Sequence, residues 1–254
     1  MLTKKFCSRR VKMSINRVEV MSENTVLSVD QVRKSYGKKS VLKGMTFDIE
    51  KGKIVGFLGP NGCGKTTLVK LINGLIPITS GEIRVCGYDI GKETKARISY
   101  LPERTYLNNW MKVKDILEFF DDVYEDFDKD KAEQMLFDMN IKLGDKLKTM
   151  SKGTKEKVQL VLVMSRDADL YILDEPIAGV DPAARSYIMK TILTNLPEES
   201  SLLIVTHLIS DIETICDEII FVNEGRVLMH EETEYLREKY NKSIDAIFRE
   251  EFRC

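Results

Sequence analysis

The spacing of apolar residues divides the chain into strand-rich and helix-rich segments. Apolar and polar positions alternate in VLSVDQV (26–32), MTFDI (45–49) and IRV (83–85). Alternation with a period of two is typical of strands that bury one face. These segments therefore predict a small antiparallel β subdomain in the first third of the chain.

A second kind of strand has no alternation. Continuous apolar runs occur in IVGFL (54–58), YILD (171–174) and LLIVT (202–206), and each run leads into a helical pattern. Parallel sheets covered by helices on both faces have strands of this kind. We therefore expect an α/β fold with a parallel-sheet core.

Between about Pro102 and Arg166 the apolar period changes to that of helices. Helical patterns cover VKDILEFFDDVY (113–124), DKAEQMLFDMN (130–140) and TKEKVQLVLVM (154–164). We interpret 102–166 as a helical subdomain inserted between strands of the core.

The two ends of the chain differ from the segment between them. The first 18 residues carry six basic residues and no acidic residue, and we expect residues 1–24 to form a disordered, dispensable basic leader. The main domain then covers 25–230. Over 231–254 apolar residues recur every four positions, which predicts one amphipathic C-terminal helix. These residues are Leu236, Tyr240, Ile244, Phe248 and Phe252.

The strongest chemical motif follows the strand IVGFL. It consists of Gly59, Pro60, Asn61, Gly62, Cys63, Gly64, Lys65, Thr66 and Thr67, and it matches GxxxxGK[ST] between a strand and a helix. Glycines let the backbone N–H groups face inward, and the helix N-terminus favours anions. We expect Lys65 to contact the β and γ phosphates and the Thr66 hydroxyl to ligate magnesium. We call residues 59–67 the phosphate-binding loop.

A second acidic motif ends the strand LYILD. Asp174 and Glu175 follow this apolar run directly. An acidic strand end is the expected partner of a phosphate-binding loop, with Asp174 in the magnesium shell and Glu175 as general base. His207, directly after the strand LLIVT, is one of only two histidines and can contact the γ phosphate.

Composition and charge limit the alternatives. The 254 residues are 43% apolar, and 39 basic residues nearly balance 40 acidic ones, which argues against a nucleic-acid partner. No apolar run approaches the roughly 20 residues that span a bilayer. Five scattered cysteines without a CxxC pair indicate reduced thiols.

The order and spacing of these motifs resemble the ATP-binding domain of ABC transporters, from about Leu27 to Gly225. The family has a P-loop NTPase fold with a RecA-like core and an inserted helical subdomain. Ser151 lies 23 residues before Asp174, where the family has its signature sequence. The resemblance implies that Ser151 and Gly153 of one subunit contact ATP held by the other. Lys152 and Thr154 depart from the usual signature, and the form Ser-Lys-Gly resembles bacterial drug and ion exporters.

Two further positions take their meaning from the resemblance. Tyr36 is similar to the aromatic residue that stacks on adenine in this family. Glu103, in the sequence Tyr-Leu-Pro-Glu, stands where the family usually has glutamine in the loop that couples the ATP site to the permease. The resemblance implies that Glu103 ligates magnesium or orients water, with an added negative charge beside ATP.

The resemblance implies an ATPase that uses ATP and Mg²⁺, pairs with a second ATP-binding subunit and powers a separate membrane permease, with a preference for export. It implies a cytoplasmic protein held on the inner face of the cell membrane through that permease. Whether the dimer is a homodimer or a heterodimer, and which substrate is transported, both stay open. The alternatives are a non-transport ABC ATPase bound to ribosomes or DNA and, less favoured, another phosphate-loop enzyme such as a GTPase.

Overall fold

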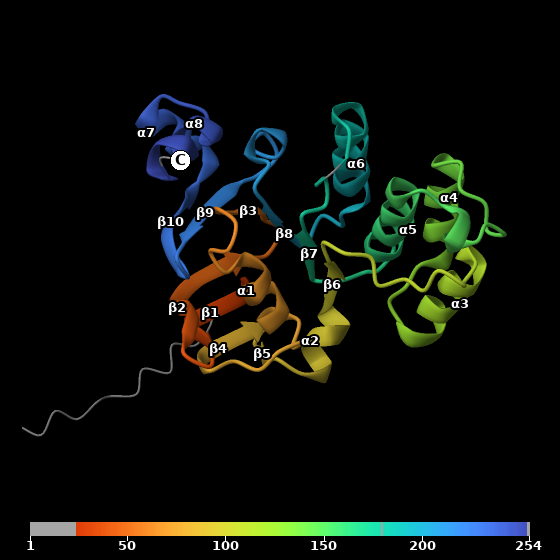
Figure 1. The fold of residues 1–254 in the computed structure, drawn as a ribbon, viewed down its shortest axis with the longest axis horizontal. Helices are drawn as coiled ribbons and strands as arrows, with labels where there is room; N and C mark the ends of the chain where they lie inside the picture. Colours follow the sequence, from red (N-terminus) through yellow and green to blue (C-terminus); the bar gives the residue numbers. More distant parts are fainter. Residues whose placement is uncertain (1–23, 179, 253–254) are drawn as a thin grey trace, which may run out of the picture.

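The protein is described here by a computed structural model in which residues 24–178 and 180–252 are placed. The predicted basic leader therefore lies outside the described residues except for Asn24. Figure 1 shows the sheets on one side of the molecule, a separate layer of helices on the other side, and the C-terminal helices beside the larger sheet.

The larger sheet has six strands. In spatial order they are β10 (Arg226–Glu232), β9 (Glu218–Asn223), β3 (Ile54–Leu58), β8 (Ser201–Thr206), β7 (Leu170–Asp174) and β6 (Ile98–Leu101). All neighbours pair in parallel except β10, which is antiparallel to β9. The predicted parallel-sheet core is confirmed. Strands β6 and β9 were not predicted, and β6 is short and lies directly after a charged helix.

The smaller sheet is antiparallel and confirms the predicted β subdomain. Its order is β2 (Lys39–Glu50), β1 (Thr25–Tyr36), β4 (Ser80–Val85) and β5 (Tyr88–Asp89). In β2 the side chains of Met45, Phe47 and Ile49 are buried, while Thr46 and Asp48 between them are exposed. Their face packs with helix α1 (Lys65–Ile72) in one apolar cluster, so this sheet lies beside the start of α1.

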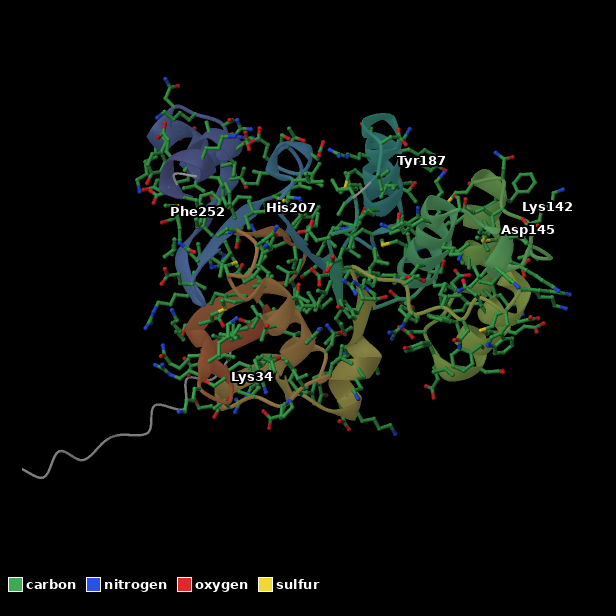
Figure 2. The ribbon with its side chains drawn as sticks, viewed as in Figure 1. Lys34, Lys142, Asp145, Tyr187, His207 and Phe252 are labelled. Carbon is green, nitrogen blue, oxygen red and sulfur yellow. The ribbon has the colours of Figure 1, made fainter. Side chains whose placement is uncertain are left out.

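The helical layer contains α3 (Val113–Val123), α4 (Lys129–Asp138) and α5 (Lys152–Met164). Two of these helices begin at capping residues, because Asp128 accepts a hydrogen bond from the Lys131 N–H and Ser151 accepts one from the Thr154 N–H. Lys142 and Asp145 lie at the far end of this layer from His207 (Figure 2). The cap at Ser151 leaves the N-terminus of α5 at an exposed position.

Arg166 joins the helical layer to the core. Its guanidinium is 5% exposed, binds the Asp126 carboxylate at 2.8 Å and donates to the backbone oxygens of Ile98 and Ala96. The group also lies 4.0 Å from the centre of the Tyr124 ring. A buried arginine with all of these partners fixes the end of α5 against β6 and the short helix α2 (Lys92–Arg97) that precedes it.

The prediction of one C-terminal helix was wrong in detail. The segment forms α7 (Thr233–Tyr240) and α8 (Ile244–Phe252), because Asn241 has φ 49° and ends α7 in the left-handed region. The apolar face was predicted correctly. The rings of Phe248 and Phe252 pack on Phe221 of β9, so α8 covers the outer part of the larger sheet.

Two expectations from composition concern the described residues. Cys63, Cys86 and Cys216 are free thiols, while Cys7 and Cys254 lie outside the described residues. Over the ranges 24–178 and 180–252, every helix is too short or too polar to cross a bilayer.

Candidate functional site

The phosphate-binding loop joins β3 to α1 and needs glycine for two different reasons. Gly64 has φ 111°, a conformation that L-residues rarely adopt. At Gly59 the limit is space, since a Cβ atom would lie 2.2 Å from the backbone oxygen of Val222. The loop can therefore curl tightly against β9 and present its N–H groups at the start of α1.

Lys65 is the first residue of α1, and it is 7% exposed. Its ammonium donates hydrogen bonds to the backbone oxygens of Gly59, at 2.7 Å, and Pro60, at 3.3 Å. The side chain is thus folded over the loop, and its charge lies inside the loop that would surround a phosphate group. This arrangement suits the predicted contact with the β and γ phosphates.

Asp174 ends β7 and is 1% exposed. Both carboxylate oxygens are buried without a hydrogen-bond partner. The pKa of Asp174 is raised to about 6, chiefly by burial and also by the charges of Glu175 and Glu103, while Thr66 and Lys65 act in the opposite direction. A buried carboxylate whose oxygens lack hydrogen-bond partners has the chemistry of a cation ligand, and the nearby Thr66 hydroxyl oxygen can ligate the same ion.

Glu175 and His207 were predicted as separate groups, and the structure brings them together. The Nδ1 atom of His207 lies 2.8 Å from Oε1 of Glu175. The Thr206 hydroxyl donates to the other carboxylate oxygen, Oε2, at 2.9 Å. The Glu175 side chain is 12% exposed and the His207 side chain 46%, so the pair lies at a surface that water and a substrate can reach.

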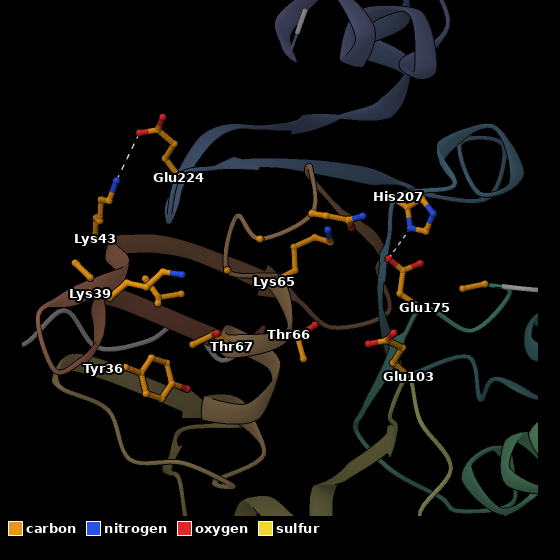
Figure 3. Close-up of a pocket in the computed structure, with 16 residues that line it drawn as sticks. Tyr36, Lys39, Lys43, Lys65, Thr66, Thr67, Glu103, Glu175, His207 and Glu224 are labelled. Atoms are coloured by element: carbon orange, nitrogen blue, oxygen red, sulfur yellow. Dashed lines mark hydrogen bonds and ion pairs between the residues drawn. The ribbon is translucent and has the colours of Figure 1, made fainter. Parts of the chain in front are cut away.

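Most of the predicted residues line one open cavity of about 620 Å³, which we call the main cavity. Figure 3 shows Lys65 and Thr66 near its centre, Glu175, His207 and Glu103 on one side, and Tyr36, Lys39 and Lys43 on the other. The predicted residues that line the cavity are Tyr36, Asn61, Gly62, Gly64, Lys65, Thr66, Thr67, Glu103, Glu175 and His207. Gly59, Pro60 and Cys63 form the loop without lining the cavity, and Asp174 lines a smaller adjoining one.

The end of the main cavity around Tyr36 was only partly predicted. Tyr36 is 50% exposed, which leaves its ring available for stacking. Lys39, Lys43 and Glu224 also line this end, and Lys43 pairs with Glu224 at 3.5 Å. Lys39 has no carboxylate partner among the ion pairs of the described residues. At this end of the cavity, the sequence predicted a role for Tyr36 alone.

Ser151 and Gly153 do not join the main cavity. Both lie at the N-terminus of α5, in the helical layer, where Ser151 is exposed and a Cβ atom at Gly153 would meet nothing within 4 Å. Lys152 and Lys155 lie at the start of α5, and its first turn contains no acidic residue. An exposed helix N-terminus with this charge can accept an anion from another molecule, and neither Ser151 nor Gly153 lines the protein's own main cavity.

The residues present offer a magnesium ion only part of its coordination, so a bound nucleotide would have to supply the remaining oxygens. Over the described ranges, no group of three or more His, Cys, Asp or Glu side chains could hold a metal ion. The unpartnered oxygens of Asp174 beside Thr66 supply two protein ligands, and Mg²⁺ is usually held by few protein oxygens with phosphate oxygens and water. The site therefore suits magnesium that arrives with a nucleotide.

Three residues of the site were missed at the sequence level. Neither Thr206 nor Lys39 stands out in the sequence. The contact of Thr206 with Glu175 depends on strand register, and the position of Lys39 at the main cavity depends on the path of the hairpin between β1 and β2. The turn at Gly225 was detectable, since Asn223, Glu224 and Gly225 separate the apolar runs IIFV and RVLM. Gly225 binds the phosphate-binding loop through its backbone N–H, which donates to Cys63 O at 2.9 Å.

Comparison with known proteins gives consistent matches. The profile of the family described as ABC transporter matches residues 42–178. The chain is 32% identical over 211 residues to "Linearmycin resistance ATP-binding protein LnrL" of Bacillus subtilis, covering 80% of this chain and 68% of that protein. It is 30% identical over 209 residues to "Nod factor export ATP-binding protein I" of Paraburkholderia xenovorans, covering 79% and 68%.

A solved structure gives the same result. The structure described as "Structure of ATP binding subunit of ABC transporter" superposes with a TM-score of 0.80 and 28% identity, and it covers 89% of this chain and 99% of that chain.

Proposed function

The chain belongs to the ABC transporter family, and from that premise we propose that it binds ATP with Mg²⁺ in the main cavity and hydrolyses ATP as one half of a dimer that drives a separate membrane permease. One observation supports this most strongly. Three distant segments, containing Lys65, Glu175 and His207, line one cavity. ATP-binding subunits of this family hydrolyse ATP to power transport.

We assign the binding residues from their places in the cavity. Tyr36 stacks on the adenine, and Lys65 with the loop N–H groups binds the β and γ phosphates. Thr66, Asp174 and Glu103 hold the magnesium shell. Magnesium, when bound, neutralises charge that develops on the transferred phosphoryl group.

The chemical step uses the pair of Glu175 and His207. The Glu175 carboxylate takes a proton from water as the water oxygen bonds to the γ phosphorus, and the bond between that phosphorus and its bridging oxygen breaks to leave ADP and phosphate. His207 contacts the Glu175 carboxylate through Nδ1, which leaves Nε2 for the γ phosphate. Lys65 stabilises the negative charge that develops.

The second subunit completes the site. Ser151 and Gly153 at the N-terminus of α5 are exposed and do not line the main cavity, so they suit contact with ATP held by a partner. Two copies, or a copy and a paralogue, would then enclose two ATP molecules. Closing of the dimer on ATP would move the permease, and hydrolysis would reopen it.

Transport is favoured over a ribosome- or DNA-associated ATPase, because the similar proteins are named as ABC transporter subunits. The Ser-Lys-Gly signature favours export, and this preference is supported by one relative named for export and one named for resistance. We place the protein on the inner face of the membrane through its permease. Fractionation tests this placement, because the protein should sediment with membranes only when the permease is co-expressed.

The activity is tested by Glu175→Gln, which keeps the shape of the side chain and removes its basicity. We expect ATP binding to persist and turnover to fall at least about tenfold, equivalent to roughly 1.4 kcal/mol of barrier. Glu199→Gln, at an exposed carboxylate before β8, is the matched control. Equal turnover in both variants would remove Glu175 from the chemical step.

A further inference from the structure

Thr206 lies at the end of β8 and is fully buried. It pairs in register with Leu58, the last residue of β3 before the phosphate-binding loop. Its hydroxyl contacts two groups: it donates to Oε2 of Glu175 at 2.9 Å and accepts from the Leu208 N–H at 3.0 Å. The buried Thr206 hydroxyl therefore lies between β3, which leads into the phosphate-binding loop, and the Glu175 carboxylate.

Three consecutive residues bind Glu175 together. The Glu175 N–H donates to the Val205 oxygen at 2.8 Å, Thr206 binds Oε2, and His207 binds Oε1. Glu175 itself has φ 54°, a left-handed conformation that is uncommon outside glycine, asparagine and aspartate. Such a conformation persists where surrounding contacts determine it. The end of β8 supplies these contacts.

The direction of the Thr206 hydroxyl is fixed by chemistry. An ionised carboxylate only accepts hydrogen bonds, so the hydroxyl hydrogen points to Glu175. The Leu208 N–H can only donate, so it occupies a lone pair of the same oxygen. Since Thr206 is fully buried, no water can take over its contact with Glu175. The hydroxyl therefore acts as a fixed donor to one oxygen of the carboxylate.

We propose that Thr206 is a positioning residue for ATP hydrolysis, which orients the Glu175 carboxylate so that a lone pair faces the attacking water. This inference rests on the proposed function of Glu175. With His207 on Oε1 and Thr206 on Oε2, rotation of the carboxylate breaks at least one hydrogen bond. Accurate placement of a base is worth large factors in rate.

Two substitutions separate the hydroxyl from the shape of the side chain. Thr206→Val keeps the β-branched shape and loses the donor, while Thr206→Ser keeps the donor. In the full chain with ATP and Mg²⁺, we expect Thr206→Val to lower kcat about tenfold with the KM for ATP within twofold of the unsubstituted protein. Thr206→Ser should keep at least half of the original kcat. A kcat for Thr206→Val within twofold of the original would overturn the proposal.

A merely structural role of Thr206 is tested by combining substitutions. If Thr206 acts through Glu175, Thr206→Val should not lower the residual rate of Glu175→Ala any further. An additional tenfold loss in the double variant would overturn the proposal. Melting temperatures identify variants that fail to fold, and Thr206→Ser then carries the test, because a tenfold loss of kcat in a folded Thr206→Ser protein contradicts it.

Failure of the proposed function would look different. In that case Glu175→Ala would hydrolyse ATP as fast as the original chain, or the original chain would show no Mg²⁺-dependent hydrolysis with its permease present. If Glu175→Ala is slow and Thr206→Val is normal, only the role of Thr206 is wrong.

Discussion

The backbone N–H of Gly225 donates a 2.9 Å hydrogen bond to the carbonyl oxygen of Cys63, so the turn between β9 and β10 binds the outer side of the phosphate-binding loop. The Gly225 oxygen in turn accepts from the Lys43 N–H at 2.8 Å. One turn thus connects the loop to β2, whose residues line the other end of the main cavity. The loop is held in place by segments far from it in sequence.

This contact predicts that Gly225→Ala weakens the fold and the binding of ATP. Gly225 has φ 77°, and a Cβ atom would lie 2.0 Å from the Val41 oxygen. Gly87→Ala is the control, because Gly87 has φ 83° but open space around its Cβ position. We expect Gly225→Ala to cost at least about 2 kcal/mol more than Gly87→Ala in the free energy of unfolding. Urea denaturation measures this, and equal costs would show that the turn adapts.

Lys39 offers a second prediction at the Tyr36 end of the main cavity. Figure 3 places its side chain between Tyr36 and the phosphate-binding loop, where the sugar and α phosphate of ATP would lie. Lys39→Met should raise the dissociation constant for ATP about threefold to tenfold, equivalent to roughly 1 kcal/mol. Lys38→Met removes the same charge from an exposed neighbour that does not line the cavity. Calorimetric titration should show no change in the dissociation constant for Lys38→Met. Equal effects of the two substitutions would mean that Lys39 acts only through the overall positive charge of this surface.

A third prediction concerns pH and lies outside the site. The Glu218 carboxylate bonds to Nε2 of His230 at 2.7 Å, and this hydrogen bond, with the charges of His230 and Lys53, lowers the pKa of Glu218. A depressed pKa stabilises the fold above the unfolded value of 4.5, and the gain is lost as pH falls through the folded value. Glu218→Gln should therefore melt about 2–4 °C below the original protein at pH 7, for a loss of about 1 kcal/mol.

That difference should shrink as the pH falls below 4.5 and through the lowered pKa of Glu218, because the protonated carboxyl group resembles the amide. Glu238→Gln, at an exposed carboxylate of α7, is the control and should show a small difference at every pH. A difference that stays constant with pH would assign the loss to packing.

The sequence was informative where function depends on neighbours along the chain. The strand, loop and helix around Lys65 form one continuous motif, so its identity and its place followed from residue types alone. Asp174 and Glu175 were predicted as site residues for the same reason, since an apolar strand that ends in acids is a local pattern.

Contacts between distant segments were not predictable in this way. The bond from Thr206 to Glu175 requires β8 to lie beside β7 with Asp174 opposite Val205, and a shift of one residue would turn the hydroxyl to the other face. The same holds for Gly225 and Cys63. The break at Asn241 was missed because the apolar period continues across it, while the backbone there turns left-handed.

The final prediction tests the dimer through Ser151. Glu175→Gln should trap ATP between two copies, so that light scattering after gel filtration shows a dimer with ATP and Mg²⁺ and a monomer without them. Adding Ser151→Arg should abolish the dimer, because a bulky cation replaces the cap of α5 where the partner's γ phosphate would bind. Ser243→Arg is the matched control, since Ser243 is also exposed and accepts a bond from the Ala246 N–H near the start of α8. If both combinations dimerise equally, contact between Ser151 and ATP of the partner is wrong. If both combinations instead stay monomeric while Glu175→Gln alone dimerises, the loss of a helix cap prevents dimerisation, rather than the loss of a contact with the partner's ATP.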